Sequence, residues 1–477
     1  MKKIVLTLAA GMILAWPVLG LASVSSVDSL IQKLEDKGIL TAQDAVQIKG
    51  EIASDQKASQ EATFKSLLPD WVSGLKVSGD FRLRDQDQVR KTVGAGGSSA
   101  HLTDNRVRIR ARLNFEDQIN DKVKLVVGIA TNGENANGVG NPRSNNITLG
   151  GNNSVLNNIT KSTGSTTIAY QEGTFSKPTV VLNKAYAVYT PAPWATLMGG
   201  KMDNPVWEPA STPLLWDPDI TPEGGAIKLE HRLNDYVTPF STNAIFILKD
   251  LTPSIGTSIS SGYGINTNGV KTDPYMFVTQ EGIKGNLTEK VYYKAAGSYY
   301  NVNNPNHFPL DYSSSGNTMS STTGLTGTYS YNYNLVGGGV DFGMNDPFGE
   351  LLPSPLYIPQ IGFMGEYYRN VDPAHQNSAW MMGAYMGSSA INGLGTWKIQ
   401  SYYKVLEADS WLAALPDDDF YSGNTNTQGL RTQLDLGLAK NLWFTMSYFK
   451  TSIFKHATGS TLSAPEDLFQ MDLNFKF

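Results

Sequence analysis

One segment of the chain alternates strictly between apolar and polar residues, and this period of two limits the possible folds more than any other feature. In DNRVRIRARLNFEDQ (104–118), apolar side chains occupy every second position from Val107 to Phe115, and arginines and Asn114 occupy the positions between them. Only an extended strand places alternate residues on opposite faces. The segment therefore predicts a β-strand with one apolar face and one strongly basic face.

The same alternation recurs from residue 75 to the end of the chain. It is clear in 75–84, in 430–438 and in the last segment, whose apolar face ends at Phe477. Tight turns and long loops rich in Asn, Ser, Gly and Thr separate these segments. We expect sixteen strands, over 75–85, 104–116, 122–132, 179–190, 194–202, 224–233, 240–249, 275–285, 290–301, 328–343, 355–369, 378–390, 395–407, 427–439, 441–455 and 467–477.

This pattern predicts an all-β fold, a transmembrane antiparallel β-barrel of about 16 strands. Soluble sandwiches also alternate, but their loops do not divide into a short and a long set, as those of membrane barrels do. A sheet in lipid must close so that every backbone group is paired. The arginine face must point to the lumen, because an Arg facing lipid at the bilayer midplane costs about 2–4 kcal/mol. Sixteen strands leave that lumen filled with water.

The first 70 residues differ from the rest. Residues 1–22 begin with two lysines, continue with an apolar run and end in small residues, which is typical of a cleaved signal peptide. Residues 23–70 contain two stretches with apolar residues at helical spacing. We therefore expect a signal peptide (1–22), a short N-terminal helical segment in the periplasm (23–70) and the barrel (71–477).

Composition excludes several functions. The chain has no cysteine, which excludes disulfides, thiolate zinc sites, iron–sulfur clusters and c-type haem attachment. A net charge of −5 argues against binding nucleic acid through bulk charge. The five histidines are scattered and none has HExxH spacing, so we expect no enzyme, no cofactor and no metal. The acidic residues Asp217, Asp219 and Glu223 do not have the spacing of an EF-hand calcium loop.

Arginines cover the polar faces of the first two predicted strands. Neighbouring strands lie about 4.8 Å apart and same-face residues about 6.8 Å apart, which is within the Debye length of about 8 Å. Their charges would act together, and rings of Arg and Lys favour anions in pores. Alternatively, they pair with acidic residues of the lumen and only hold the strands in register. The expected pore-lining basic wall consists of Arg82, Arg84, Arg106, Arg108, Arg110 and Arg112.

The third outer loop, predicted at 203–223, combines two tryptophans and five prolines with acidic residues and has no Lys or Arg. A stiff, partly apolar loop is best satisfied by folding inward and packing on the barrel wall. We expect it to narrow the pore and face the arginines across a water-filled gap, which would select solutes by size and polarity. The alternative is an external cap over the mouth. The acidic residues of this expected constriction are Asp203, Glu208, Asp217, Asp219 and Glu223.

Three segments resemble the Putative porin family of Gram-negative outer-membrane barrels. They are GGKMDNPVWEPASTPLLWDPDITPEGGAIKLE (199–230), QKLEDKGILTAQDA (32–45) and VSGDFRLRDQ (77–86). Phe477, at the end of an alternating aromatic strand, resembles the assembly signal read by the barrel-assembly machinery. The resemblance implies a diffusion channel, and in sixteen-stranded general porins the third loop narrows the pore.

We therefore expect an outer-membrane porin for passive diffusion of ions and small hydrophilic solutes. The expected partners are outer-membrane lipid and lipopolysaccharide, the barrel-assembly machinery and two further copies in a homotrimer. Two alternatives remain open at this point. The barrel could be the sheath of a porin–cytochrome electron conduit, with a multihaem cytochrome as partner, or a non-conducting structural or adhesin barrel.

Overall fold

The structure is a computed structural model. It describes residues 74–93, 99–132, 141–150, 158–163, 166–171, 179–211, 213–250, 273–303, 305, 310, 315–320, 328–351, 357–455 and 465–477. The predicted signal peptide (1–22) and helical segment (23–70) lie outside these residues. The chain divides into two compact units, Met1–Gly74 and Leu75–Phe477, and only the second is discussed below. Within the described part of the chain, no helix is long and apolar enough to cross a membrane.

Sixteen antiparallel strands form the barrel. They are β1 (Lys76–Val93), β2 (Ser99–Asn120), β3 (Val123–Thr131), β7 (Val180–Ala192), β8 (Ala195–Lys201), β9 (Glu223–Glu230), β10 (Thr238–Ile247), β11 (Tyr275–Asn286), β12 (Val291–Val302), β13 (Tyr333–Asn345), β14 (Gln360–Asn370), β15 (Ser378–Gly387), β16 (Trp397–Leu406), β17 (Thr427–Ala439), β18 (Leu442–Ile453) and β19 (Glu466–Lys476). The short β4 (Ile147–Thr148) pairs with β2, and β5 (Asn158–Thr163) pairs with β6 (Thr166–Gln171).

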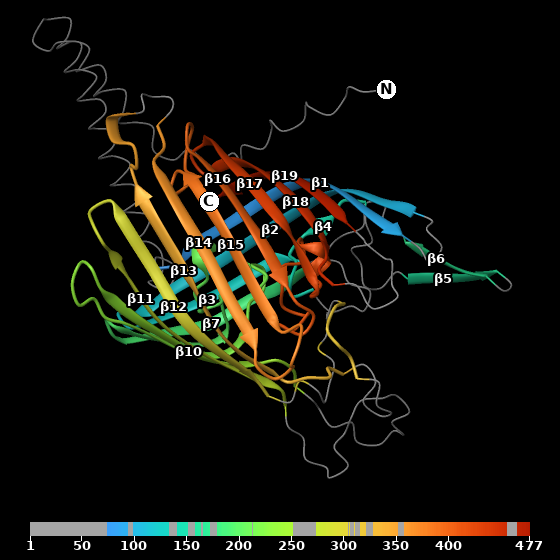
Figure 1. The fold of residues 1–477 in the computed structure, drawn as a ribbon, viewed down its shortest axis with the longest axis horizontal. Helices are drawn as coiled ribbons and strands as arrows, with labels where there is room; N and C mark the ends of the chain where they lie inside the picture. Colours follow the sequence, from blue (N-terminus) through green and yellow to red (C-terminus); the bar gives the residue numbers. More distant parts are fainter. Residues whose placement is uncertain are drawn as a thin grey trace, which may run out of the picture. The chain divides into compact units, whose positions relative to one another are not determined.

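The barrel closes through its first and last strands, which lie side by side in Figure 1. Each strand pairs with the next one along the chain, and β1 also pairs with β19, so that Arg84 lies opposite Asp472. The backbone N–H of Phe477 continues this seam by donating to the carbonyl of Gly79 at 3.1 Å. Closure leaves no unpaired edge strand in the ring, which is what a sheet in lipid requires.

Alternation along each strand gives the barrel an apolar outside and a polar inside. On β2, the side chain of Val107 is 43% exposed on the outer face, whereas Arg108, the next residue, is 8% exposed and points inward. The same holds for Leu83 and Arg84 on β1, at 39% and 4%. The β-branched and other apolar residues therefore form the lipid-facing surface, and the arginines face the lumen, as their cost in lipid requires.

The sequence predicted every one of the sixteen strands, and the main difference is the length of the first two. The alternation predicted 75–85 and 104–116, whereas β1 continues to Val93 and β2 begins at Ser99. The extension of β1 begins with polar residues on both faces, Gln86 inside and Asp87 outside, so no continuous apolar face marks it in the sequence. Backbone pairing between the two strands continues there without the lipid-facing stripe.

Candidate functional site

The six arginines of the predicted basic wall come together on the inner face of two paired strands. The register places Arg82 opposite Arg110 and Arg84 opposite Arg108, while Arg112 faces Asp80 and Arg106 faces Gln86. This arrangement follows from the antiparallel pairing of two strands that both alternate with a period of two. The lumen therefore has one wall with a high density of guanidinium groups.

Carboxylates neutralise part of this wall. Asp472 of β19 pairs with Arg84 at 2.7 Å and lies 3.8 Å from Arg82. Asp80 of β1 pairs with Arg110 at 3.0 Å and with Arg112 at 2.7 Å. Both aspartates are on the inner faces of strands. The wall is therefore a network of alternating charges in which the arginines also hold β1, β2 and β19 in register.

Two arginines at the outer end of the wall are less well paired. Arg106 pairs with Asp104, whose side chain is 55% exposed, at 3.1 Å. Among the described residues, Arg108 forms one hydrogen bond, a long one of 3.5 Å from Nη2 to the hydroxyl of Ser144. Its Nε has no hydrogen-bond partner although it is buried. Positive charge is thus least compensated at this end of the wall.

The third loop, residues 202–222 between β8 and β9, is folded into the barrel. Its apolar side chains are buried: Met202 and Leu214 have no exposed surface, Leu215 is 2% exposed and Trp216 is 3% exposed. The Trp216 ring packs edge-on against Phe246 on the inner face of β10, with centroids 5.9 Å apart. By folding inward, the loop buries its apolar side chains against the barrel interior instead of leaving them in water.

Contacts of the third loop reach opposite sides of the ring. Asp219 binds Arg110 and Arg112 on β2, at 3.4 and 3.3 Å. The backbone N–H of Ala210 donates to Asp341 on β13 at 3.1 Å, and β13 is eight pairings away from β2 in the sixteen-stranded ring. Between these ends, the backbone of Trp207 exchanges two 2.9 Å hydrogen bonds with the side chain of Gln280 on β11. The loop therefore crosses the lumen.

The seventh loop, residues 407–426 between β16 and β17, is also folded inward, which sequence reasoning missed. Trp411 is fully buried and packs edge-on against Trp216, with centroids 6.2 Å apart. Its indole N–H donates to the carbonyl of Leu215 at 2.7 Å, and the N–H of Asp217 donates to the carbonyl of Leu415 at 2.7 Å. The apolar run WLAALP (411–416) was the available signal, since it is too apolar for a loop in water.

The seventh loop also reaches the arginine wall. A run of three aspartates such as Asp417, Asp418 and Asp419 is usually solvated, but Asp417 is only 6% exposed. Asp419 pairs with Arg84 at 2.8 Å. The arginine wall is therefore bridged by one carboxylate from each inward loop, Asp219 from the third and Asp419 from the seventh.

The five acidic residues of the predicted constriction do not act as one group. Asp219 alone of the five forms ion pairs with the arginine wall in the described structure. Asp203 pairs with Lys184 of β7, and Glu223, which is the first residue of β9 instead of a loop residue, pairs with Lys201 at 2.9 Å. Of the remaining two, Asp217 contacts Leu415 and Asp418 of the seventh loop, and Glu208 lines a cavity together with Arg112.

Electrostatics separate the loop carboxylates into two kinds. Burial would raise the pKa of Asp219, but Arg110 and Arg112 outweigh it and lower the pKa. Burial raises the pKa of Asp217 well above its usual value, and Asp418 and Asp417 raise it further. Burial likewise raises the pKa of Glu208 to about 8. Asp219 is thus a stable counter-ion for the wall, whereas Asp217 and Glu208 favour their neutral forms.

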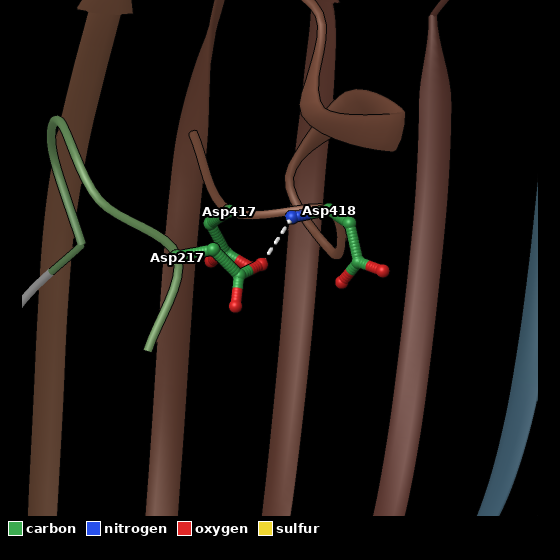
Figure 2. A group of neighbouring side chains, drawn as sticks. All are labelled: Asp217, Asp417 and Asp418. Carbon is green, nitrogen blue, oxygen red and sulfur yellow. Dashed lines mark hydrogen bonds between the residues drawn. The ribbon is translucent and has the colours of Figure 1, made fainter. Parts of the chain in front are cut away.

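Asp217, Asp417 and Asp418 meet where the two inward loops touch (Figure 2). One carboxylate oxygen from each lies within 4.8 Å of the other two. The N–H of Asp418 donates to Asp217 at 2.9 Å, while the Asp418 side chain points away from the other two. These backbone bonds make the cluster part of the contact between the two loops.

Two polar cavities remain beside the inward loops. One, of about 350 Å³, lies between the third loop and the wall and is lined by Arg112, Asn183, Lys184, Asp203 and Asp219 among others. The other, of about 250 Å³, lies beside the seventh loop and is lined by Arg106, Arg108 and Arg143 together with Asp418 and Asp419. Both cavities border the arginine wall, so water and small ions inside the barrel would meet these charges.

Several solved structures are similar to this chain. The high pH structure of OprB from Pseudomonas putida has 8% sequence identity and a TM-score of 0.46, with 85% of this chain and 94% of that chain covered. The outer membrane channel DcaP of Acinetobacter baumannii has 11% identity and a TM-score of 0.38, covering 84% and 97%. A mutant of the Rh. blastica porin has 9% identity and a TM-score of 0.39, covering 84% and 100%.

Sequence comparison gives the family. No curated protein sequence matches the chain. A family model does match, over residues 97–334 and 360–477, and that family is described as Putative porin. The two matched ranges include the second arginine strand, the third loop, the seventh loop and the C-terminal strand. The chain therefore belongs to the Putative porin family, as the resemblance of its motifs implied.

Proposed function

We propose that the protein is a water-filled diffusion channel of the outer membrane, in which the third loop forms the constriction. The observation that carries the proposal is the crossing of the lumen by residues 202–222, from Asp219 on the β2 side to Ala210 on the β13 side. A solute passing through the barrel would have to go around this loop. Membership of a porin family supports the channel itself.

The constriction would select solutes by size and by charge. The six arginines outnumber the four inner carboxylates that bind them, since Asp80, Asp219, Asp419 and Asp472 together bind only Arg82, Arg84, Arg110 and Arg112. Of the other two, Arg106 forms an ion pair only with exposed Asp104, and Arg108 shares none of these carboxylates in the described structure. Excess positive charge close to the path favours anions over cations.

Arg106 and Arg108 are the two arginines outside this network of four aspartates. The imbalance is therefore concentrated at the outer end of the wall, where the arginines have an exposed carboxylate partner or none among the described residues.

Conductance of the purified protein in a planar bilayer tests the proposal. We expect stepwise ion conductance, and a reversal potential in a KCl gradient displaced toward that of chloride. Shortening the third loop by removing residues 207–218 should raise the single-channel conductance, because these residues fill the lumen. A barrel that inserts but carries no current would contradict the channel, and an unchanged conductance in the shortened variant would contradict the constriction.

One observation favours a second candidate, a non-conducting barrel. The third and seventh loops form a continuous apolar cluster with the inner wall, which includes Trp216, Trp411 and Tyr300. Such packing could fill the lumen as a plug does, and the same bilayer experiment separates the two functions. The inward loops also occupy space that a cytochrome would need, which weighs against the sheath of an electron conduit.

We also propose that the barrel assembles with further copies of itself. Polar residues interrupt the apolar outer face of β10 and β11, where Ser241 donates to Glu281 at 2.7 Å and Asn243 donates to Ser241 at 2.9 Å. A carboxylate on a lipid-facing surface is unfavourable, so contact with another subunit would explain it. Cross-linking in native membranes tests this: trimers support the assembly, and monomers at all cross-linker concentrations contradict it.

A further inference from the structure

The cavity beside the seventh loop has the features of a binding site. Its volume is about 250 Å³, and it is lined by residues of β1, β2, the segment 141–144 and the seventh loop. Three arginines, Arg106, Arg108 and Arg143, line it together with two aspartates, Asp418 and Asp419. Liquid water occupies about 30 Å³ per molecule, so the cavity has room for a small solute with several non-hydrogen atoms.

Arg108 is the unusual residue in this cavity. It is 8% exposed, its Nε is buried without a hydrogen-bond partner, and it forms no ion pair with a carboxylate of the described residues. Its cross-strand neighbour Arg84 is held by both Asp419 and Asp472. Asp418 and Asp419 attract the Arg108 guanidinium but form no ion pair with it, so part of the hydration that it loses on burial is not replaced by hydrogen bonds. The remaining donors of Arg108 are therefore available to a ligand that enters the cavity.

The surrounding groups favour an anion as that partner. Arg106 lies two residues away on the same face of β2, and its pairing with exposed Asp104 can be exchanged for a ligand at little cost. The two aspartates add little negative charge: Asp419 is already engaged by Arg84, and burial raises the pKa of Asp418 to about 8. The hydroxyl of Ser144 supplies a further polar group beside Arg108.

From this geometry we infer that Arg108 and Arg106 form a binding site for the oxyanion group, carboxylate or phosphate, of a small solute inside the barrel. Guanidinium groups match such groups because they donate parallel hydrogen bonds to two oxygens. The inference rests on the proposed diffusion function and extends it, since it names the class of solute that the channel would retain on its path. The third loop and Asp219 take no part in this site.

Calorimetric titration of the refolded full chain in detergent tests the site without requiring ion flow. Sodium succinate and sodium phosphate serve as probes, and sodium chloride at matched ionic strength is the reference. We expect saturable binding of at least one probe at millimolar concentrations. In Arg108→Gln we expect the affinity to fall by about tenfold or more, because a charge-assisted hydrogen bond is lost. Arg108→Lys keeps the charge and should retain part of the affinity.

Lys284→Gln is the matched control. Lys284 is also a cation of the inner wall, but it is paired with Glu230 at 2.8 Å and does not line this cavity. Its loss should leave probe binding unchanged. Unheated gel mobility verifies that each variant is folded before it is titrated. Binding of succinate alone would assign the site to carboxylates, and binding of phosphate alone would assign it to phosphates; both outcomes support the inference.

Two results would overturn the inference. One is the absence of saturable binding of either probe to the folded wild-type protein. The other is equal affinity in wild type and in Arg108→Gln. A wild-type protein that conducts ions but binds neither probe would refute this site and leave the proposed channel intact. A protein that binds a probe through Arg108 but carries no current would refute the channel and leave the site intact.

Discussion

Replacing Asp219 by asparagine is the sharpest test of how the third loop is held against the arginine wall. The substitution keeps the size of the side chain and one oxygen acceptor, but removes the charge that faces Arg110 at 3.4 Å and Arg112 at 3.3 Å. Asp219 is only 9% exposed, so solvent screens these contacts weakly. Both arginines keep Asp80 as a partner, which limits the damage to the wall itself.

The expected loss follows from these contacts. A hydrogen bond to a charged group contributes about 1.5–3 kcal/mol, and both bonds are longer than the usual range. We therefore expect the docked loop to lose about 2 kcal/mol in Asp219→Asn, which raises the population of a displaced loop about thirtyfold. The apolar anchors around Trp216 remain, so the loop should open transiently and not leave the barrel.

The assay is ion selectivity and current noise in a planar bilayer. Loss of one negative charge beside two arginines should shift the reversal potential in a KCl gradient toward that of chloride, and transient opening should add current fluctuations. Asp203→Asn is the matched control, because Asp203 lies in the same loop but pairs with Lys184 and is exposed. If Asp219→Asn has the selectivity and noise of wild type, Asp219 does not hold the loop and the reasoning is wrong.

Three further predictions concern assembly and packing. Deleting Phe477, which hydrogen-bonds to Gly79 at the barrel seam, should reduce the heat-modifiable folded form on gels of outer membranes; a normal yield would count against it. Gly224→Ala should destabilise the barrel by about 1–3 kcal/mol, because the φ of Gly224 is +152° and an added Cβ would lie 2.0 Å from the carbonyl oxygen of Ile245. Gly199→Ala is the control and should be tolerated, because a Cβ there meets nothing within 4 Å. Equal unfolding midpoints of the two variants in urea would contradict this prediction. Trp216→Ala should raise single-channel conductance, since the indole fills space between β10 and the seventh loop, and an unaltered conductance would show that the ring lies away from the path.

The barrel could be predicted from the sequence because contact with lipid on one face makes apolar and polar residues alternate along each strand. Val107 and Arg108 are neighbours with opposite environments, and only a strand between lipid and water explains their alternation. The sequence of the inward loops predicts their structure less specifically. Trp216 and five prolines indicated an inward third loop. The partners of Asp219, however, depend on which strand faces the loop across the lumen, and a sequence pattern does not show which strand that is.

The seventh loop shows more clearly which contacts cannot be predicted from the sequence. Its aspartates, 417–419, look like a solvated charge run when only the neighbours in sequence are considered. Asp419 is half-buried and pairs with Arg84, 335 residues away in the chain, and Asp217 accepts a hydrogen bond from the N–H of Asp418. Contacts of this kind are set by the closure of the ring and by the packing of Trp411 on Trp216. Local sequence patterns predict strands well, but they predict contacts between residues that are distant in the chain poorly.

The two loops should respond to pH in opposite directions, which gives a last prediction. The pKa of Asp219 is lowered in the folded state, so its contribution to docking is present above the unfolded value of about 3.9 and is lost as pH falls through its folded pKa. The pKa of Asp418 is raised to about 8 by burial and by Asp419 and Asp417, against the opposing effects of Arg108 and Arg143. For a raised carboxyl the sign reverses: folding is favoured while the group is protonated, and this advantage disappears as pH rises toward 8.

Docking of both loops should therefore be most stable at about pH 4, where Asp219 is ionised and Asp418 is protonated whether or not the loop is docked. Between about pH 4 and pH 8 the undocked loop gains stability by releasing the proton of Asp418, so the seventh loop should loosen progressively. Conductance in symmetric buffers should then rise with pH up to about 8 in wild type. Asp418→Asn cannot ionise and should hold conductance constant across that range. If wild type and Asp418→Asn show the same alkaline rise, the titrating group is elsewhere and the contact between the loops is not set by Asp418.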